Sequence, residues 1–357
     1  MRILVYDVAA EDGGGLFVLK SFYREVLAND NKDIEWIFMV STDEIEQTDK
    51  VRVLCYPQVK ISWKARLRFE YLQLPKIVKE LDPDLVISLQ NMPIKRCKVR
   101  QFVYLHQSLQ YCPKKFSLLK GEERGLAIRQ KFISFLIKNA MPKAEHIFVQ
   151  TQWIKDATVK WLRRDEKEIT IVPVRVNTDG ISIKEYTGAE SRTFFYPARA
   201  EIYKNHSLIM EACKILKERG VSDYRVLLTM QRDENPYAER ITASAESLPV
   251  AYIGAVSYEE IWDIYSRSIL LFPSYLETCG LPMLEARRAG ALILASDMPF
   301  SHEALDGYPN AAFFGINGPE KLAELMQKCL ENPAYHKVAE KDDRKSESLL
   351  CSMMKLI

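Results

Sequence analysis

The sequence has few of the features that mark several common classes of protein. Its five histidines and seven cysteines are scattered without the spacing of zinc ligands, so we expect no metal site. No apolar run approaches the ~20 residues that span a bilayer. The N-terminal MRILVYDVAAED reaches acidic residues too early for a secretory signal. Together with the unpaired cysteine count, these absences predict a cytoplasmic protein.

The chain also lacks an excess of charge of either sign. Lys and Arg number 50 against 48 Asp and Glu, so the composition predicts no nucleic-acid partner. We see no internal repeat of solenoid length and no low-complexity tract. With 357 residues, 47% of them hydrophobic, the chain is long enough for two domains with full cores.

Short apolar runs alternate with helical patterns along most of the chain, which predicts α/β architecture with parallel, doubly wound sheets. Val172 to Arg192 breaks this alternation with Pro, Asn, Asp and Gly, which is typical of a linker. We therefore predict Rossmann-like domains at 1–180 and 181–333. The short tail, 334–357, is a candidate crossover helix.

The stretch from Phe272 to Glu303 is the most informative. A buried strand ends at Phe272, and a loop with Glu277 leads to a helix with Pro282 in its first turn, the position that suits proline. Glu285 lies inside that helix, and we expect Leu281, Leu284 and Ala289 to form its buried stripe. Two carboxylates can accept hydrogen bonds from vicinal sugar hydroxyls, while free N–H groups at the helix start favour a diphosphate. The alternative is that both acids only favour the positive end of the helix.

A second loop carries two cations after a strand. Phe194 to Tyr196 is followed by Arg199 and Lys204, before a helix that begins near His206. An arginine fork and a lysine point charge can together hold a diphosphate. The alternative is that both are ordinary solvated side chains.

These motifs, PARAEIYKN followed by PSYLETCGLPMLEA and GALILASDMPFSHE, resemble the retaining glycosyltransferases of family 4, which have the GT-B fold. The resemblance is clear over Thr193 to Asn332 and weaker before it. It implies two Rossmann-like domains facing across a cleft. The family usually has Gly-aromatic where this chain has Thr278-Cys279, and a glycine-rich loop where it has Thr229-Met230-Gln231.

The resemblance also implies roles for individual residues. Glu285 would bind the donor ribose, while Arg199 and Lys204 would neutralise the departing diphosphate. Donor-sugar contacts would come from Glu277 and the backbone of Thr278, Cys279, Gly280 and Leu281, and nucleobase contacts from the backbone near Gly254.

The first half carries two weaker signals. Gly13-Gly14-Gly15 follows a strand and leads into a helix, which suits close approach of a ligand to the backbone, or only a flexible loop. His106 stands just past a predicted strand, Phe102 to Leu105. The resemblance implies that Gly14 and Gly15 face the donor phosphate or the acceptor and that His106 contacts the donor sugar. A structural histidine is the alternative.

The tract from Pro93 to Lys143 is strongly basic, with acids only at Glu122 and Glu123. Within it Ile128, Phe132, Phe135, Leu136 and Met141 recur at near-helical spacing. One interpretation is a basic amphipathic helix that docks on anionic lipid. We favour the other, a helix whose apolar side faces the core and whose charges face water.

The sequence thus predicts a retaining, metal-independent glycosyltransferase that needs no cofactor. It would move a sugar from a nucleotide diphosphate sugar to a glycan or lipid-linked acceptor in bacterial surface polysaccharide synthesis, in the cytoplasm or at the inner face of the membrane. Two alternatives stay open: a sugar-nucleotide epimerase of the same fold, and a non-catalytic subunit that binds nucleotide sugars. The donor, the acceptor and the oligomeric state are not readable from the sequence.

Overall fold

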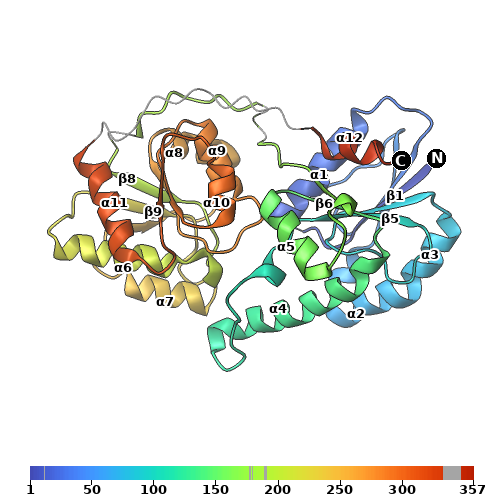
Figure 1. Cartoon of the computed structure of the whole chain (residues 1–357), viewed down its shortest axis with the longest axis horizontal. Helices are drawn as coiled ribbons and strands as arrows, with labels where there is room; N and C mark the ends of the chain where they lie inside the picture. Colours follow the sequence, from blue (N-terminus) through green and yellow to red (C-terminus); the bar gives the residue numbers. More distant parts are fainter. Residues whose placement is uncertain (12, 177, 179, 189–190, 333–346) are drawn as a thin grey trace. The chain divides into compact units, whose positions relative to one another are not determined.

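The computed structural model describes residues 1–11, 13–176, 178, 180–188, 191–332 and 347–357. The chain forms two α/β units (Figure 1). The first holds Met1–Pro113, Ile128–Pro173 and the C-terminal helix, and the second holds Lys114–Ala127 and the chain from Val174 up to the segment before that helix. The predicted end of the second domain at 333 lies outside the described residues.

The first domain is built on a parallel sheet in the order β3-β2-β1-β4-β5-β6-β7. Its strands are β1 (Arg2–Asp7), β2 (Glu35–Val40), β3 (Val51–Cys55), β4 (Leu85–Ser88), β5 (Arg100–Leu105), β6 (His146–Val149) and β7 (Ile169–Ile171). Its helices are α1 (Gly13–Leu27), α2 (Trp63–Arg68), α3 (Leu74–Leu81), most of α4 (Gly121–Ala140), α5 (Gln152–Leu162) and α12 (Leu349–Met354).

Alternation along β1 explains how helices cover both faces of this sheet. Ile3 and Val5 pack with α1 and α12, whereas Leu4 and Tyr6 pack with α3 and the turn before it. Successive strand residues point to opposite faces, and both sets are apolar, which is the pattern of a sheet buried on both sides.

The second domain repeats the design with a parallel sheet in the order β10-β9-β8-β11-β12-β13. Its strands are β8 (Thr193–Tyr196), β9 (Arg225–Leu228), β10 (Val250–Tyr252), β11 (Ile269–Phe272), β12 (Ile293–Ser296) and β13 (Ala311–Phe314). Its helices are α6 (His206–Glu218), α7 (Pro236–Ser244), α8 (Tyr258–Ser266), α9 (Leu281–Arg288), α10 (Pro299–Ala304) and α11 (Pro319–Glu331).

Residues 63–81 form one helical segment, in which a turn of π-helix, Phe69–Gln73, joins α2 and α3. The interpretation of α4 as a helix whose apolar side faces the core is wrong for Ile128, Phe132 and Phe135, which are exposed. Of the other two residues in that pattern, Met141 is buried and Leu136 is partly covered. Helix α4 buries another side, with Gln130, Ile137 and Ala140 among its covered residues.

Candidate functional site

Both sheets reverse their strand order at one point, and the site residues of the second domain gather there. Strand β8 lies beside β11, although β9 and β10 lie on one side and β12 and β13 on the other. The connections after β8 and β11 therefore leave in opposite directions, which opens the crevice where α/β sheets bind ligands. Arg199 and Lys204 follow β8, and Glu277 follows β11.

Backbone hydrogen bonds fix the two loops to each other. The Tyr275 N–H donates to the carbonyl of Tyr203 at 3.0 Å, and the Ser274 hydroxyl donates to the same oxygen at 3.1 Å. Asn205, in the left-handed region with φ 58°, donates through its side chain to the Pro273 carbonyl at 3.3 Å. The positions of Lys204 and Glu277 are thus set by backbone contacts as well as by their own pairing.

Lys204 and Glu277 form an ion pair, with Nζ 2.6 Å from Oε1. The two side chains are only 19% and 14% exposed, so water screens their charges weakly. The sequence predicted that both residues would face the donor, and the structure brings them together. Arg199 lies exposed in the same loop as Lys204, three residues beyond β8.

Helix α9 starts at Gly280, which adopts φ 64° at the N-cap. Glycine suits this backbone, because an added Cβ would stand 2.3 Å from Cε of the buried Met283. Leu281 opens the helix, and Pro282 occupies its first turn as predicted. Pro282 has no N–H, and the Met283 N–H donates to the Gly280 carbonyl at 2.9 Å, so the N–H groups of Gly280 and Leu281 are the candidates to hydrogen-bond an anion at this helix start.

Glu285 is the most perturbed carboxyl group near this helix start. It is only 5% exposed, and the Tyr265 hydroxyl of α8 donates to its Oε2 at 3.0 Å. Burial raises the pKa of Glu285 to about 7, although hydrogen bonds from Tyr265 and Tyr258 oppose the shift. The predicted buried stripe of α9 is right for Ala289, which is buried, but Leu281 and Leu284 are only partly covered. The buried residues of the helix are Met283, Glu285 and Ala286.

Cys279 is buried, and the charges of both Glu277 and Glu285 act on its thiol. Burial raises the pKa of its thiol to about 12, and the charge of Glu277 and, more weakly, that of Glu285 act in the same direction. The thiol therefore stays protonated and is a poor nucleophile. Thr278 is half-buried in the same loop. Gly254, with φ 69°, follows β10, two strands away from β8.

In the first domain, His106 and Gly15 lie close together. A Cβ added to Gly15 would stand 4.0 Å from Cε1 of His106, whereas nothing lies within 4 Å of one added to Gly14. The His106 Nε2 lies 2.7 Å from the Leu89 carbonyl and must donate to it, and Asn91 accepts a hydrogen bond from the His106 N–H at 2.7 Å. Burial lowers the pKa of His106, so the ring is neutral at physiological pH, with Nδ1 unprotonated.

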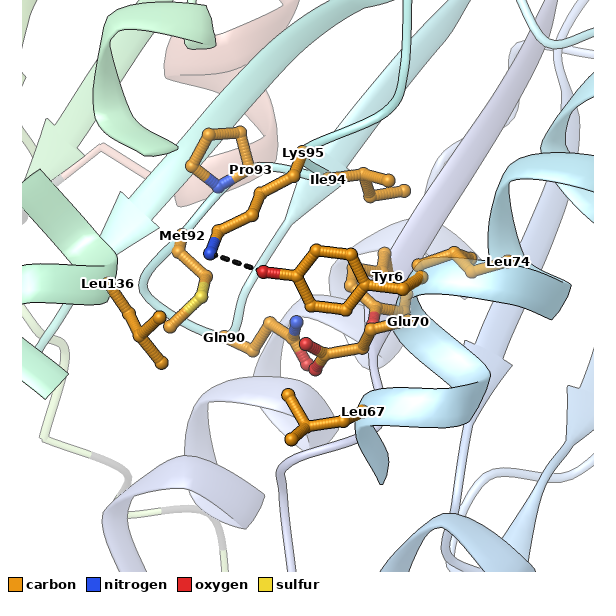
Figure 2. Close-up of a pocket in the computed structure, with 11 residues that line it drawn as sticks. Tyr6, Leu67, Glu70, Leu74, Gln90, Met92, Pro93, Ile94, Lys95 and Leu136 are labelled. Carbon is orange, nitrogen blue, oxygen red and sulfur yellow. Dashed lines mark hydrogen bonds between the residues drawn. The ribbon is translucent and has the colours of Figure 1, made fainter. Parts of the chain in front are cut away.

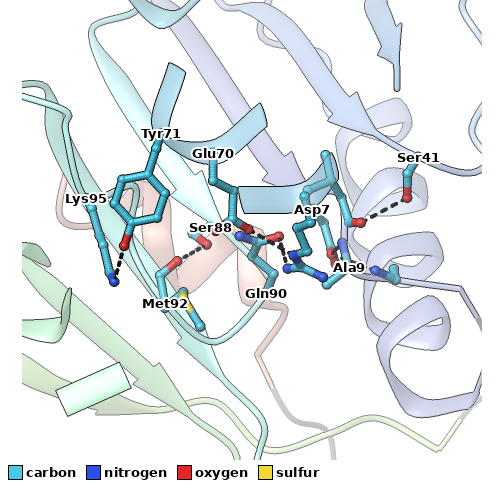
Figure 3. Close-up of polar contacts among 12 residues, drawn as sticks. Asp7, Ala9, Ser41, Glu70, Tyr71, Ser88, Gln90, Met92 and Lys95 are labelled. Carbon is cyan, nitrogen blue, oxygen red and sulfur yellow. Dashed lines mark hydrogen bonds and ion pairs between the residues drawn. The ribbon is translucent and has the colours of Figure 1, made fainter. Parts of the chain in front are cut away.

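Asp7 ends β1 at the strand-order reversal of the first sheet and was given no role from the sequence. Its Oδ1 accepts hydrogen bonds from the N–H groups of Ala9 and Ala10 at 3.0 and 2.9 Å, which shapes the turn ahead of α1 (Figure 3). Burial raises the pKa of Asp7 to about 6. We assign Asp7 the task of holding this turn in place.

A narrow pocket opens beside the same reversal (Figure 2). The space inside it that can hold the centre of a water molecule is about 20 Å³, so the pocket is small. Tyr6 and Gln90, from the ends of β1 and β4, line it together with Glu70 of the π-helical turn. Lys95 also lines it and donates to the Tyr71 hydroxyl at 2.7 Å (Figure 3). The remaining walls are apolar and include Leu67, Leu74, Met92, Pro93, Ile94 and Leu136.

Comparison with known proteins finds a family model that matches the second domain. The family model described as "Glycosyl transferases group 1" matches residues 177–346, which cover most of the second domain and contain both loops and α9. The second domain is therefore similar to the group 1 glycosyl transferases. The resemblance predicted from PARAEIYKN and PSYLETCGLPMLEA is confirmed at this level.

Two curated proteins are similar to this chain. An O-antigen chain mannosyltransferase of Salmonella typhimurium is 24% identical over 57% of this chain and 56% of its own length, so the chain spans little more than half of that relative. An N,N'-diacetylbacillosaminyl-diphospho-undecaprenol alpha-1,3-N-acetylgalactosaminyltransferase of Campylobacter jejuni is 24% identical over 73% of this chain and 72% of its own.

The solved structures confirm the GT-B fold. Sucrose-phosphate synthase of Thermosynechococcus elongatus superposes with a TM-score of 0.72 over 94% of this chain and 91% of its own, at 14% identity. Within the part of the chain that the structure describes, no group of three or more His, Cys, Asp or Glu could hold a metal ion. No described helix is both long and apolar enough to cross a membrane.

Sequence reasoning missed the aromatic partners of Glu285. Tyr258 and Tyr265 are both on α8, seven residues apart, with Trp262 between them. That spacing puts the three on one helix face, a pattern usually caused by core packing. In the structure α8 packs against α9. Only this contact brings Tyr258 and Tyr265 to the carboxyl group of Glu285, which lies twenty or more positions further along the chain.

Proposed function

We propose that the protein is a retaining glycosyltransferase that moves a sugar from a nucleotide diphosphate sugar to an acceptor hydroxyl. The observation that carries this proposal is the half-buried Lys204–Glu277 pair at the β8/β11 reversal, next to the start of α9. A cation and free helix N–H groups there suit a departing diphosphate, while Glu277 and Glu285 suit sugar and ribose hydroxyls.

In this mechanism the leaving group is stabilised by fixed positive charge. Lys204, Arg199 and the N–H groups of Gly280 and Leu281 would neutralise the diphosphate as the bond to the sugar breaks. Because these groups supply the positive charge, we propose that no divalent metal is needed. Glu277 would exchange its bond with Lys204 for a bond to the donor sugar.

We further propose a lipid-linked glycan as the acceptor, in bacterial surface polysaccharide synthesis. The two relatives support this choice, since one is named for the O-antigen chain and the other for a diphospho-undecaprenol glycan. The first domain would bind the acceptor, with Gly14 and Gly15 as candidate contacts, while His106 would contact the donor sugar. The reaction would then take place on the cytoplasmic side of a membrane.

A thermal-shift panel tests the donor site. Wild type and Lys204→Ala are mixed with UDP, GDP, ADP and their sugars, with EDTA present. A ligand at ~100 times its dissociation constant should stabilise wild type by about 2.7 kcal/mol. We expect one nucleotide family to stabilise wild type and not the variant. If no nucleotide stabilises wild type, the donor site is wrongly assigned.

Product analysis then tests the reaction. With the stabilising donor and a polyprenyl-diphosphate-linked sugar, we expect transfer in the presence of EDTA and an NMR spectrum in which the product keeps the donor's anomeric configuration. Inversion would refute the retaining mechanism. Conversion of the donor without acceptor would favour the epimerase alternative.

A further inference from the structure

No role was predicted for the loop after β9, where Thr229-Met230-Gln231 replaces the glycine-rich stretch of the resembling family. We call the residues from Thr229 to Asn235, the N-cap of α7, the β9 loop. Strand β9 is the neighbour of β8 in the sheet, so the β9 loop lies beside the loop after β8. Its side chains hydrogen-bond to the backbone on both sides of Arg199.

Two side chains at the end of the β9 loop bind Ala200, the residue after Arg199. The Ala200 N–H donates to Oε1 of Glu234 at 3.0 Å, and Nδ2 of Asn235 donates to the Ala200 carbonyl at 2.8 Å. The other carboxylate oxygen of Glu234 accepts the N–H of Gln231 at 3.2 Å, which fixes the carboxylate to its own loop. Ala200 is only 1% exposed, so its backbone bonds are shielded from water.

Further bonds hold the peptide groups next to Arg199. The Thr229 hydroxyl donates to the Ala198 carbonyl at 3.4 Å, and the Glu201 N–H donates to the Arg199 carbonyl at 2.8 Å. The two planar peptide groups that meet at the Arg199 Cα are therefore both held, and together they set its φ and ψ. The exposed Arg199 side chain consequently leaves the backbone in a fixed direction.

Lys204, the second cation after β8, is held from the opposite side. Its neighbours Tyr203 and Asn205 bond to the loop after β11, and β11 lies on the side of β8 away from β9. The two cations proposed to bind the diphosphate are thus fixed separately, Lys204 by the loop after β11 and Arg199 by the β9 loop. A fixed backbone lowers the entropy that is lost when a ligand binds.

We propose that Glu234 and Asn235 are positioning residues, which hold Arg199 where it can donate to the diphosphate of a nucleotide donor. This inference rests on the proposed function, because it takes Arg199 to be a diphosphate ligand. The carboxylate of Glu234 is negatively charged and by charge alone would repel a diphosphate. Positioning of Arg199 has the opposite effect on binding, so the two effects of Glu234 can be told apart by the sign of the change.

Titration calorimetry with UDP, GDP and ADP tests the proposal on the full chain. For the nucleotide that binds wild type, Glu234→Ala should raise the dissociation constant about tenfold, because Arg199 loses its fixed position. Asp233→Ala removes an exposed carboxylate from the same loop and is the matched control. It should leave binding unchanged or make it slightly tighter, since it removes only a repulsive charge.

Asn235→Ser provides a second test without a change of charge. Serine can keep the N-cap of α7, where Asn235 accepts the Ala238 N–H at 3.0 Å, but the substitution removes the amide that donates to Ala200. We expect nucleotide binding to weaken again by about tenfold, at a melting temperature close to that of wild type. In hydrogen exchange followed by mass spectrometry, peptides that contain Ala200 should exchange faster in both variants without nucleotide.

A double-mutant cycle separates positioning from a general effect on the domain. In an Arg199→Ala background, Glu234→Ala should weaken nucleotide binding no further, because the side chain that it positions is gone. Additive losses, tighter binding by Glu234→Ala alone, or unchanged binding by both Glu234→Ala and Asn235→Ser would each overturn the proposal and leave the donor site in place. Failure of every nucleotide to bind wild type would instead refute the proposed function, and this inference with it.

Discussion

Glu285 is a buried acid whose ionisation the fold disfavours. Its pKa rises from an ordinary 4.5 to about 7 because burial removes water from the carboxylate. Above pH 7 the folded protein therefore carries a negative charge on the buried Glu285, and this charge lowers its stability relative to the unfolded chain. A ribose whose hydroxyls hydrogen-bond to the carboxylate would favour the charged form and would lower this pKa again.

We predict that Glu285→Gln stabilises the ligand-free protein at high pH. Between pH 4.5 and 7 the folded state binds more protons than the unfolded state, so wild-type stability falls as pH rises through this window. At about 1.4 kcal/mol per pKa unit, the gain in the variant approaches about 3 kcal/mol at pH 8 and vanishes near pH 4.5. Denaturant unfolding at pH 5 and pH 8 measures it.

Two observations control this prediction. Glu259→Gln, an exposed carboxyl on the same α8 that carries Tyr265, should change stability little at either pH. Glu285→Gln should also lose the stabilisation by nucleotide that wild type shows. A variant that is less stable than wild type at pH 8 would contradict the account.

Lys204 allows a test that separates stability from ligand binding. Lys204→Ala leaves the half-buried Glu277 without its 2.6 Å partner, at a cost of about 1–3 kcal/mol. We predict that adding Glu277→Gln restores the melting temperature but not the stabilisation by nucleotide. Thermal shifts of both variants measure this, with the exposed Lys214→Ala of α6 as control. Recovery of nucleotide binding in the double variant would exclude Lys204 as a diphosphate ligand.

At the scale of elements, the start of α9 depends on one glycine. Gly280 and Gly254 have similar backbones, with φ of 64° and 69°, so alanine at either position costs about 1–2 kcal/mol for the left-handed conformation. Only at Gly280 must the new Cβ also displace a buried side chain, Met283. We predict that Gly280→Ala destabilises the protein clearly more than Gly254→Ala in denaturant unfolding. Equal losses would mean that the space around Gly280 is unimportant.

The strands were the elements most readable from the sequence. Runs such as Ile269–Phe272 and Leu85–Ser88 are buried on both faces, so their apolar composition alone marks them. The loops after the strands could be located from the alternation of strands and helices. For this reason Lys204 and Glu277 were both identified from the sequence as candidate contacts of one donor. The ion pair between them depends on β8 lying beside β11, and the order of strands along the chain does not reveal this.

Helix faces were less readable. The apolar spacing of Ile128, Phe132 and Phe135 is what a core-facing helix shows, but α4 offers two apolar sides and the sheet covers the other one. The same limit affected α9, where Glu285 took a buried position expected for leucine. Periodicity shows that a helix has an apolar side, but which side is covered depends on elements distant in the sequence.

At the scale of the molecule, helix α12 joins the core of the first domain. Leu349, Leu350 and Met353 belong to the same buried cluster as Val18, Phe22 and Val26 of α1. The Leu350 N–H donates to the Glu25 carboxylate at 2.8 Å. The first domain is thus completed by residues that follow the second domain in the sequence.

We predict that Met353→Ala destabilises the first domain by about 2–5 kcal/mol, since it empties a fully buried position. Hydrogen exchange followed by mass spectrometry should show lost protection in α1 and β2, while peptides from α6 to α11 keep theirs. Ile357→Ala, which shortens an exposed side chain nearby in the sequence, should leave both unchanged. Uniform loss of protection across both domains would mean that they unfold as one unit.

This arrangement has a consequence for the growing chain on the ribosome. Residues up to 173 emerge first, yet the α1 side of their sheet lacks α12 until the whole second domain has been made. The second domain, in contrast, has its described strands and helices by α11, ahead of α12 in the chain. The first domain therefore cannot complete its core until residues that follow the second domain have been made, and a chain halted before α12 would leave the α1 side of that sheet without this helix.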